Sequence, residues 1–98
     1  MDMEKVVSPS EVFERDIRWL QECDLVIAEV STPSHGVGYE ISFALNLGKP
    51  VLCLFQKGEK VSKMITGNSN PNILLCNYKD PNEALSNIKA FIVRSWHL

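Results

Sequence analysis

Three short apolar runs recur along the chain at intervals of about 25 residues. They cover Leu25 to Val30, Pro50 to Phe55 and Ile73 to Tyr78. Each run is continuously apolar rather than alternating, which is typical of strands buried on both faces of a parallel sheet. The segments around these runs have helical patterns. The hydrophobic pattern therefore predicts a βαβ succession of strands and helices.

Capping signals predict where the first two helices begin and end. Ser8-Pro9-Ser10-Glu11 matches a capping box, so the first helix should run from there to about Glu22. The second helix is expected to begin near Gly36 or Val37 and to end at Gly48, a residue suited to a left-handed C-terminal cap.

Two further helical segments complete the pattern. Residues 58–67 favour a short helical turn, and Asp80-Pro81-Asn82-Glu83 is typical of the start of a last helix. That helix should turn four apolar side chains toward the sheet. They are Leu85, Ile88, Ile92 and Trp96.

These elements predict an α/β fold, a Rossmann- or flavodoxin-like parallel sheet with flanking helices. The 98 residues have room for one domain, residues 1–98. Three strands are few, because open α/β sheets usually have about five or more. We therefore expect the chain to be the C-terminal part of a larger domain.

Composition excludes several classes of function. The net charge is −2 and the ten Lys and Arg are scattered, so a nucleic-acid polymer is not an expected partner. No apolar stretch approaches the roughly 18 residues that a membrane span needs, and the N-terminus does not resemble a signal peptide. Cys23, Cys53 and Cys76 indicate buried thiols in a reducing compartment. We expect a cytoplasmic protein, with the nucleus as a second candidate location, and no metal site, because no His or Cys set has ligand spacing.

Two carboxylates stand at apolar positions of the predicted helices. A helical wheel places Asp16 in the middle of an apolar arc of the first helix. The arc consists of Val12, Phe13, Ile17, Trp19, Leu20 and Cys23. Asp16 could instead sit at the rim of this arc and cap a neighbouring backbone amide. In the second helix, Glu40 points among Ile41, Phe43, Ala44 and Leu47. Glu40 could also be an ordinary acidic residue of a first helical turn, where the helix dipole would keep it ionised.

The segment before Glu40 has the features of an anion site. It follows the first predicted strand, and ligands of open α/β sheets bind beyond the carboxyl ends of strands. Gly36 and Gly38 allow backbone amides to approach a ligand, and Ser34 adds a hydroxyl, so a phosphate would fit at this helix N-terminus. Two carboxylates in different environments are also what cleavage of a glycosidic bond requires. Glu40 suits the ionised role, and Asp16, in the more apolar setting, could hold the proton.

Several motifs together resemble a known family. They are Asp16 to Leu20 (DIRWL), Cys23 to Ser34 (CDLVIAEVSTPS) and Gly36 to Glu40 (GVGYE), with weaker similarity through Lys49 to Phe55 and Val61 to Gly67. This pattern, over about residues 9 to 78, closely resembles the 2'-deoxynucleoside 5'-phosphate N-hydrolases, relatives of the nucleoside 2-deoxyribosyltransferases.

The resemblance implies a reaction and a set of site residues. The expected reaction is hydrolysis of the N-glycosidic bond of a deoxynucleoside 5'-monophosphate, without metal or other cofactor. By resemblance, Glu40 attacks the sugar, Asp16 assists departure of the base, and Ser34 with the two glycines holds the 5'-phosphate. The turn Ser62, Lys63 and Met64 would reach the phosphate site of a neighbouring subunit in a homodimer, although such a polar turn can equally be solvated surface.

The chain also departs from this family. Its members begin with a strand, a phosphate loop, a helix and a second strand, and this chain has no counterpart of them. Two alternatives therefore stay open. One is transfer of deoxyribose between bases, and the other is a non-catalytic nucleotide-binding or dimerisation module.

Overall fold

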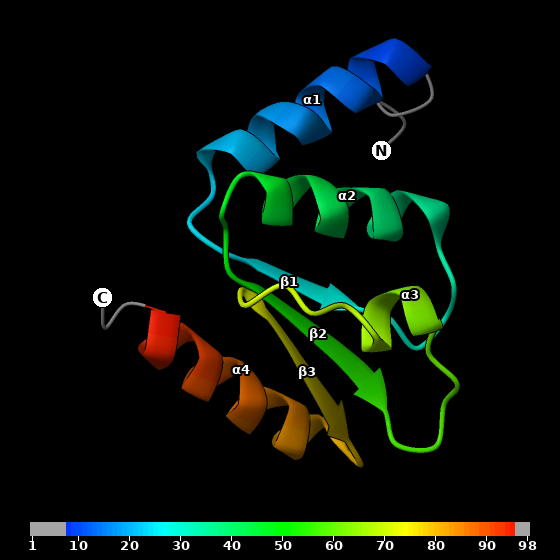
Figure 1. The fold of residues 1–98 in the computed structure, drawn as a ribbon, viewed down its shortest axis with the longest axis vertical. Coiled ribbons are helices and arrows are strands. Elements are labelled where there is room, and N and C mark those ends of the chain that lie inside the picture. Colours follow the sequence, from blue (N-terminus) through cyan, green and yellow to red (C-terminus); the bar gives the residue numbers. More distant parts are fainter. Residues whose placement is uncertain (1–7, 96–98) are drawn as a thin grey trace, which may run out of the picture.

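The sheet predicted from the apolar runs is present. The computed structural model describes residues 8–95, so the prediction for Trp96 lies outside the described residues. In chain order the elements are α1 (Pro9–Glu22), β1 (Val26–Glu29), α2 (His35–Asn46), β2 (Val51–Gln56), α3 (Lys63–Thr66), β3 (Ile73–Tyr78) and α4 (Pro81–Ser95). The strands are parallel in the order β1-β2-β3, which confirms the α/β prediction (Figure 1).

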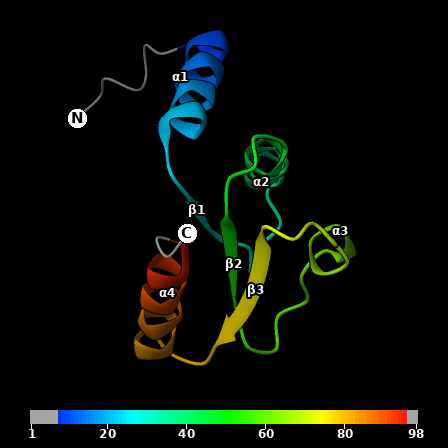
Figure 2. The same cartoon turned by 60° about the vertical axis from the view of Figure 1, so that its left-hand side comes forward.

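The helices cover the two faces of the sheet unequally. α2 lies on one face and α4 on the other, while α1 packs on α2 (Figures 1 and 2). β2 is buried on both faces. Its Val51 and Cys53 belong to the core shared with α2, and its Leu52 and Leu54 pack with Phe91 of α4. A continuously apolar strand is what this central position requires.

Local signals set the helix ends as expected. Ser8 forms the predicted capping box with Glu11, and α1 ends at Glu22. After α2, Gly48 has a φ of 78°, the left-handed conformation that glycine adopts without strain. α2 starts at His35, next to the predicted start near Gly36, and Ser34 is its N-cap.

The predicted apolar faces of α1 and α4 are only partly correct. In α1 only Leu20 is buried, and the side chains of Phe13 and Trp19 are 53% and 58% exposed. The reason is that α1 rests on α2 and not on the sheet, so only part of its apolar arc is covered. In α4, Leu85 and Ile92 are exposed, and Phe91 is the buried residue.

Cys23, Cys53 and Cys76 are free, but they are not equally buried. Cys53 is fully buried in β2, and desolvation raises its pKa to about 11. Cys23 and Cys76 are only partly covered, which corrects the expectation of three buried thiols. A structural Cys53 that holds its proton is unreactive.

Candidate active site

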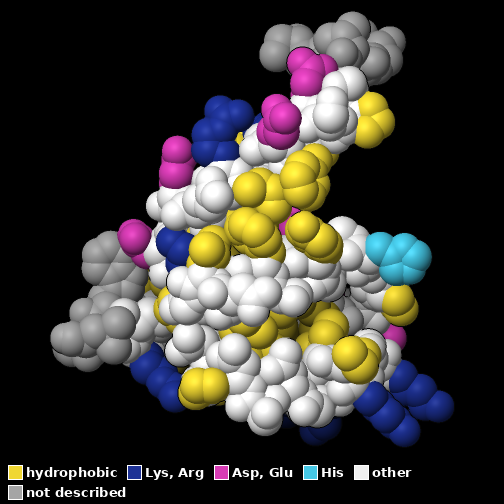
Figure 3. All heavy atoms as spheres, turned by 45° about the horizontal axis from the view of Figure 1, so that its top comes forward, with side chains coloured by type: hydrophobic (Ala, Val, Ile, Leu, Met, Phe, Trp, Pro, Cys, Tyr) yellow, Lys and Arg dark blue, Asp and Glu magenta, His cyan; other side chains and the backbone are white. Residues whose placement is uncertain are grey.

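Asp16 and Glu40 line one groove between α1 and α2. The groove has a volume of about 550 Å³. Apart from the two carboxylates, its walls are formed by Pro9, Val12, Phe13, Ile17, Leu20, Gly36 and Tyr39. Hydrophobic side chains gather over these helices in Figure 3, with the charged residues of α1 toward its outer side. The structure thus brings together the two carboxylates that the sequence singled out, in a mainly apolar setting.

The two carboxyl groups interact directly. The pKa of Glu40 is raised, first by its burial, then by the negative charge of Asp16 and by a hydrogen bond that protonated Glu40 can donate to Asp16. This shift is opposite in direction to the one expected from the helix dipole. Glu40 is the sixth residue of α2, beyond the first turn, where the dipole effect has largely decayed.

Asp16 has a second partner that sequence reasoning missed. Its Oδ1 accepts a hydrogen bond from Arg15 Nε at 3.2 Å, and the Arg15 guanidinium lies 4.8 Å from the centre of the Trp19 ring. No backbone amide within residues 8–95 donates to Asp16, so the capping alternative finds no support there. The carboxylate therefore lies between Arg15 and Glu40.

Ser34 and the two glycines form the N-terminus of α2. Ser34 Oγ accepts from the Val37 amide at 3.2 Å, so the hydroxyl predicted to face a phosphate also caps the helix. Gly36 lines the groove, whereas Gly38 does not. A Cβ atom at Gly38 would meet nothing within 4 Å, and one at Gly36 would meet only Ser34 Oγ at 4.0 Å. The helix start is therefore sterically open.

The predicted residues of the turn at 62–64 lie apart from this groove. Ser62 Oγ accepts from the Met64 amide and caps α3, and neither these residues nor Lys63 line the groove. The side chain of Met64 is 84% exposed. Within one chain the structure does not bring the turn to Asp16 and Glu40.

Among residues 8–95, no group of three or more His, Cys, Asp or Glu side chains could hold a metal ion. None of the helices in that range has both the length and the apolar character needed to cross a membrane.

An aromatic wall borders the groove, and sequence reasoning did not assign it a role. The rings of Phe13 and Tyr39 meet edge to face at 6.1 Å, and Tyr39 stacks on Phe43 at 6.4 Å. Phe13 precedes Asp16 by three residues and Tyr39 precedes Glu40, and these positions were the only available signal. Exposed aromatic rings beside two carboxylates are suited to contact with a flat aromatic ligand.

The chain is similar in sequence to several known proteins. Residues 3–83 match the family model described as nucleoside 2-deoxyribosyltransferase. A protein of Thermofilum pendens named "Putative 2'-deoxynucleoside 5'-phosphate N-hydrolase 1" is 48% identical over 94 residues, covering 94% of this chain and 66% of that protein. The 5-hydroxymethyl-dUMP N-hydrolase of Rattus norvegicus is 55% identical over 58 residues, covering 57% of this chain and 36% of that protein.

A solved structure is similar over most of the fold. The CMP N-glycosidase of Clostridium botulinum superposes with a TM-score of 0.75 at 29% identity, covering 83% of this chain and 74% of that chain. The present chain spans about two thirds of the length of the Thermofilum protein and about one third of the rat protein. With 81 consecutive positions matched, from residue 3 to residue 83, the chain belongs to the nucleoside 2-deoxyribosyltransferase family.

Proposed function

We propose that this protein hydrolyses the N-glycosidic bond of 2'-deoxynucleoside 5'-monophosphates, releasing the free base and 2-deoxyribose 5-phosphate. The observation that carries the proposal is the pair of interacting carboxyl groups, Asp16 and Glu40, in one apolar groove. The names of the relatives support the same reaction class, because they are N-hydrolases and an N-glycosidase of nucleoside monophosphates.

In the proposed mechanism Glu40 is the nucleophile. Its carboxylate forms a bond to the anomeric carbon as the bond to the base breaks, and Asp16 supplies a proton to the departing base. Water then cleaves the glycosyl–Glu40 ester and releases the sugar phosphate. The raised pKa of Glu40 makes its ionised form harder to produce, and Asp16 is the adjacent carboxylate that can accept its proton. One proton transfer from Glu40 to Asp16 would produce both the nucleophile and the acid.

The start of α2 is the proposed phosphate site. Backbone amides at a helix N-terminus attract anions, and the open space at Gly36 leaves its amide accessible, whereas the Gly38 amide already donates to the Ser34 carbonyl. Ser34 Oγ accepts from Val37 and retains its own proton for donation to a phosphate oxygen.

The direct test is release of free base from a panel of nucleoside monophosphates. The panel includes 5-hydroxymethyl-dUMP, the four common deoxynucleotides and CMP. Because the chain spans only part of its relatives, the assay also uses a chimera that adds the remaining part of the Thermofilum protein. No base release by either protein would contradict the proposal. Calorimetric binding of a deoxynucleotide without turnover would favour the non-catalytic module instead.

A transferase is the second candidate, and the description of the matching family favours it. A transferase passes the deoxyribosyl group from Glu40 to a second base rather than to water. Incubation with a deoxynucleoside that has no phosphate, together with an acceptor base, distinguishes the two. Formation of a new nucleoside would show transfer, whereas a strict requirement for the 5'-phosphate would support the hydrolase.

We also propose that the active form is a homodimer in which Ser62 to Met64 approach the phosphate site of the partner. Three observations support this arrangement. The turn is distant from the groove of its own chain, Met64 is 84% exposed, and the exposed side chains of Phe13, Tyr39 and Leu47 leave apolar surface uncovered on α1 and α2. Apolar surface of this kind is common at interfaces between subunits.

Mixed dimers test this contribution from the partner. Met64→Glu and Glu40→Gln are each expected to be inactive, since one disturbs the neighbouring phosphate site and the other lacks the nucleophile. An equimolar mixture should regain about one quarter of wild-type activity, because half of the dimers would be mixed and each mixed dimer would have one intact site. Sedimentation of both variants as dimers is the control. A fully active Met64→Glu protein, or a mixture of dimers without activity, would contradict the shared site.

A further inference from the structure

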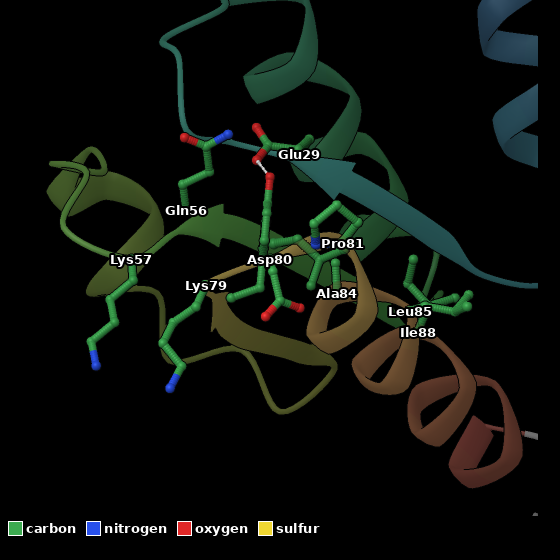
Figure 4. Close-up of a pocket in the computed structure, with 11 residues that line it drawn as sticks. Glu29, Gln56, Lys57, Lys79, Asp80, Pro81, Ala84, Leu85 and Ile88 are labelled. Atoms are coloured by element: carbon green, nitrogen blue, oxygen red, sulfur yellow. Dashed lines mark hydrogen bonds between the residues drawn. The ribbon is translucent and has the colours of Figure 1, made fainter.

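A second carboxylate, Glu29, is the centre of a polar cluster on the α4 side of the sheet. Glu29 ends β1 and points into a groove of about 870 Å³ beside α4, while Lys57 and Lys79 extend away from it (Figure 4). Its Oε1 accepts from the Ser31 amide at 2.8 Å. Its Oε2 accepts from Ser31 Oγ at 2.6 Å and from the Tyr78 hydroxyl at 2.5 Å.

These hydrogen bonds favour the ionised form of Glu29 and use both of its carboxylate oxygens. Partial desolvation would raise the pKa of Glu29, but the hydrogen bonds from Ser31 and Tyr78 outweigh it and leave the pKa below its usual value. The hydrogen bond that Tyr78 donates to Glu29 also raises the pKa of Tyr78. Because both oxygens have protein donors, Glu29 is suited to holding structure rather than to attacking a substrate.

The cluster joins the carboxyl ends of all three strands. Ser31 Oγ also accepts from the Gln56 amide at 2.8 Å, at the end of β2, and Tyr78 is the last residue of β3. In the sheet register Gln56 and Tyr78 are partners, so the cluster continues the β2–β3 pairing to β1 through side chains. Ser31, just beyond β1, is thereby bonded to Glu29 of β1 and Gln56 of β2, and it is linked to Tyr78 of β3 through Glu29.

Ser31 is close in sequence to the start of α2. Only Thr32 and Pro33 separate it from Ser34, the N-cap of that helix, and the ring of Pro33 restricts the backbone between them. The position of Ser31 therefore limits where Ser34 can lie. Ser34 in turn holds the first turn of α2 by accepting from the amides of Val37 and Gly38.

We propose that Glu29 is a positioning residue that sets the start of α2, and with it Ser34 and the amide of Gly36, by bonding Ser31 and linking it to Tyr78 at the end of β3. Its importance for substrate binding rests on the proposed function, because the positioned residues are those of the proposed phosphate site. Glu29 acts through Ser31 and makes no contact with the groove that holds Asp16 and Glu40.

Amide hydrogen exchange tests the positioning without any need for turnover. Glu29→Gln removes the charge at unchanged size, Tyr78→Phe removes one donor, and Glu59→Gln makes the same chemical change at an exposed site. In the first two variants, exchange at Ser31 should accelerate on the order of tenfold or more, and exchange at Val37 and Gly38 severalfold. The Leu52 amide in the central strand and the whole Glu59→Gln protein should keep wild-type rates.

Two exchange results would overturn the proposal. If Ser31 alone accelerated, Glu29 would order only its own loop and would not set the start of α2. If Leu52 accelerated as much as Val37, the variants would merely destabilise the entire fold. Wild-type exchange rates at every amide would show that Glu29 and Tyr78 do not hold Ser31 in place.

Kinetics supply the second measurement. With an active protein, Tyr78→Phe should raise KM for a deoxynucleoside monophosphate severalfold while kcat changes by less than about twofold, because phosphate binding is affected and the chemical step is not. An equal loss confined to kcat would contradict positioning of the phosphate site. If the wild type releases no base, the proposed function fails. The exchange rates still decide whether Glu29 positions the start of α2, because they do not depend on turnover.

Discussion

Glu40→Gln is expected to lower the rate of base release on the order of 10³-fold or more. The amide cannot form the covalent bond to the sugar, and among residues 8–95 the other carboxylate that lines the groove is Asp16. Asp16→Asn should cost about 10²- to 10⁴-fold, the usual contribution of a proton donor. The measurement is base release under saturating deoxynucleoside monophosphate, with the active dimer or chimera.

Glu14→Gln is the matched control for these variants. Glu14 lies on the exposed side of α1, so the same chemical change should leave activity within about twofold. Circular dichroism verifies that each variant is folded. Wild-type activity of Glu40→Gln would remove Glu40 as the nucleophile.

The pH profile checks the coupling between the two carboxyl groups. Glu40 must be ionised to attack, so the rate should rise with pH through the raised pKa of Glu40. Asp16→Asn removes the negative charge and the shared proton, so the pKa of Glu40 should fall and the rising limb should move to lower pH. If the rising limb of the pH profile stayed at the same pH in Asp16→Asn, the two carboxyl groups would not interact.

Leu52→Ala is expected to destabilise the fold by about 2–5 kcal/mol, the range for a truncated core leucine. Leu52 is fully buried in the central strand, where it packs with Leu54 and Phe91 between the sheet and α4. A domain of this size has roughly 5–15 kcal/mol of total stability, so the loss would be a large part of it. Urea unfolding followed by circular dichroism measures the change.

Leu85→Ala provides the comparison for this prediction. Leu85 is in α4 and its side chain is 49% exposed, so the same truncation should cost well under half as much. Equal losses at Leu52 and Leu85 would contradict the assignment of the core to the β2–α4 contact.

The strands and helix ends were predictable because their signals are local. A continuously apolar run such as Val51 to Leu54 is suited to a strand covered on both sides, and Ser8 and Gly48 mark helix ends through their own backbone geometry. Burial of the helix faces was less predictable. A helical wheel shows which residues of α1 share a side, but it does not show that the side meets α2, which leaves Trp19 exposed.

The candidate site was likewise predictable only in part. The apolar surroundings of Asp16 and Glu40 in the sequence were sufficient to single them out. The pKa of Glu40 was not predictable, because it depends on a partner 24 positions away in the chain and on burial in the groove. Likewise, the tie between Glu29 and Tyr78 joins residues 49 positions apart and has no local signature.

By itself the sequence determined the α/β class, the order of strands and helices, the family and the two candidate catalytic carboxylates, since each follows from patterns within a short stretch of chain. The tertiary structure alone decided that α1 and α2 place Asp16 against Glu40, that this contact favours the protonated form of Glu40, and that Glu29 joins the ends of three strands. These properties depend on distances across the fold and on the exclusion of water, which arise only when separate segments pack together.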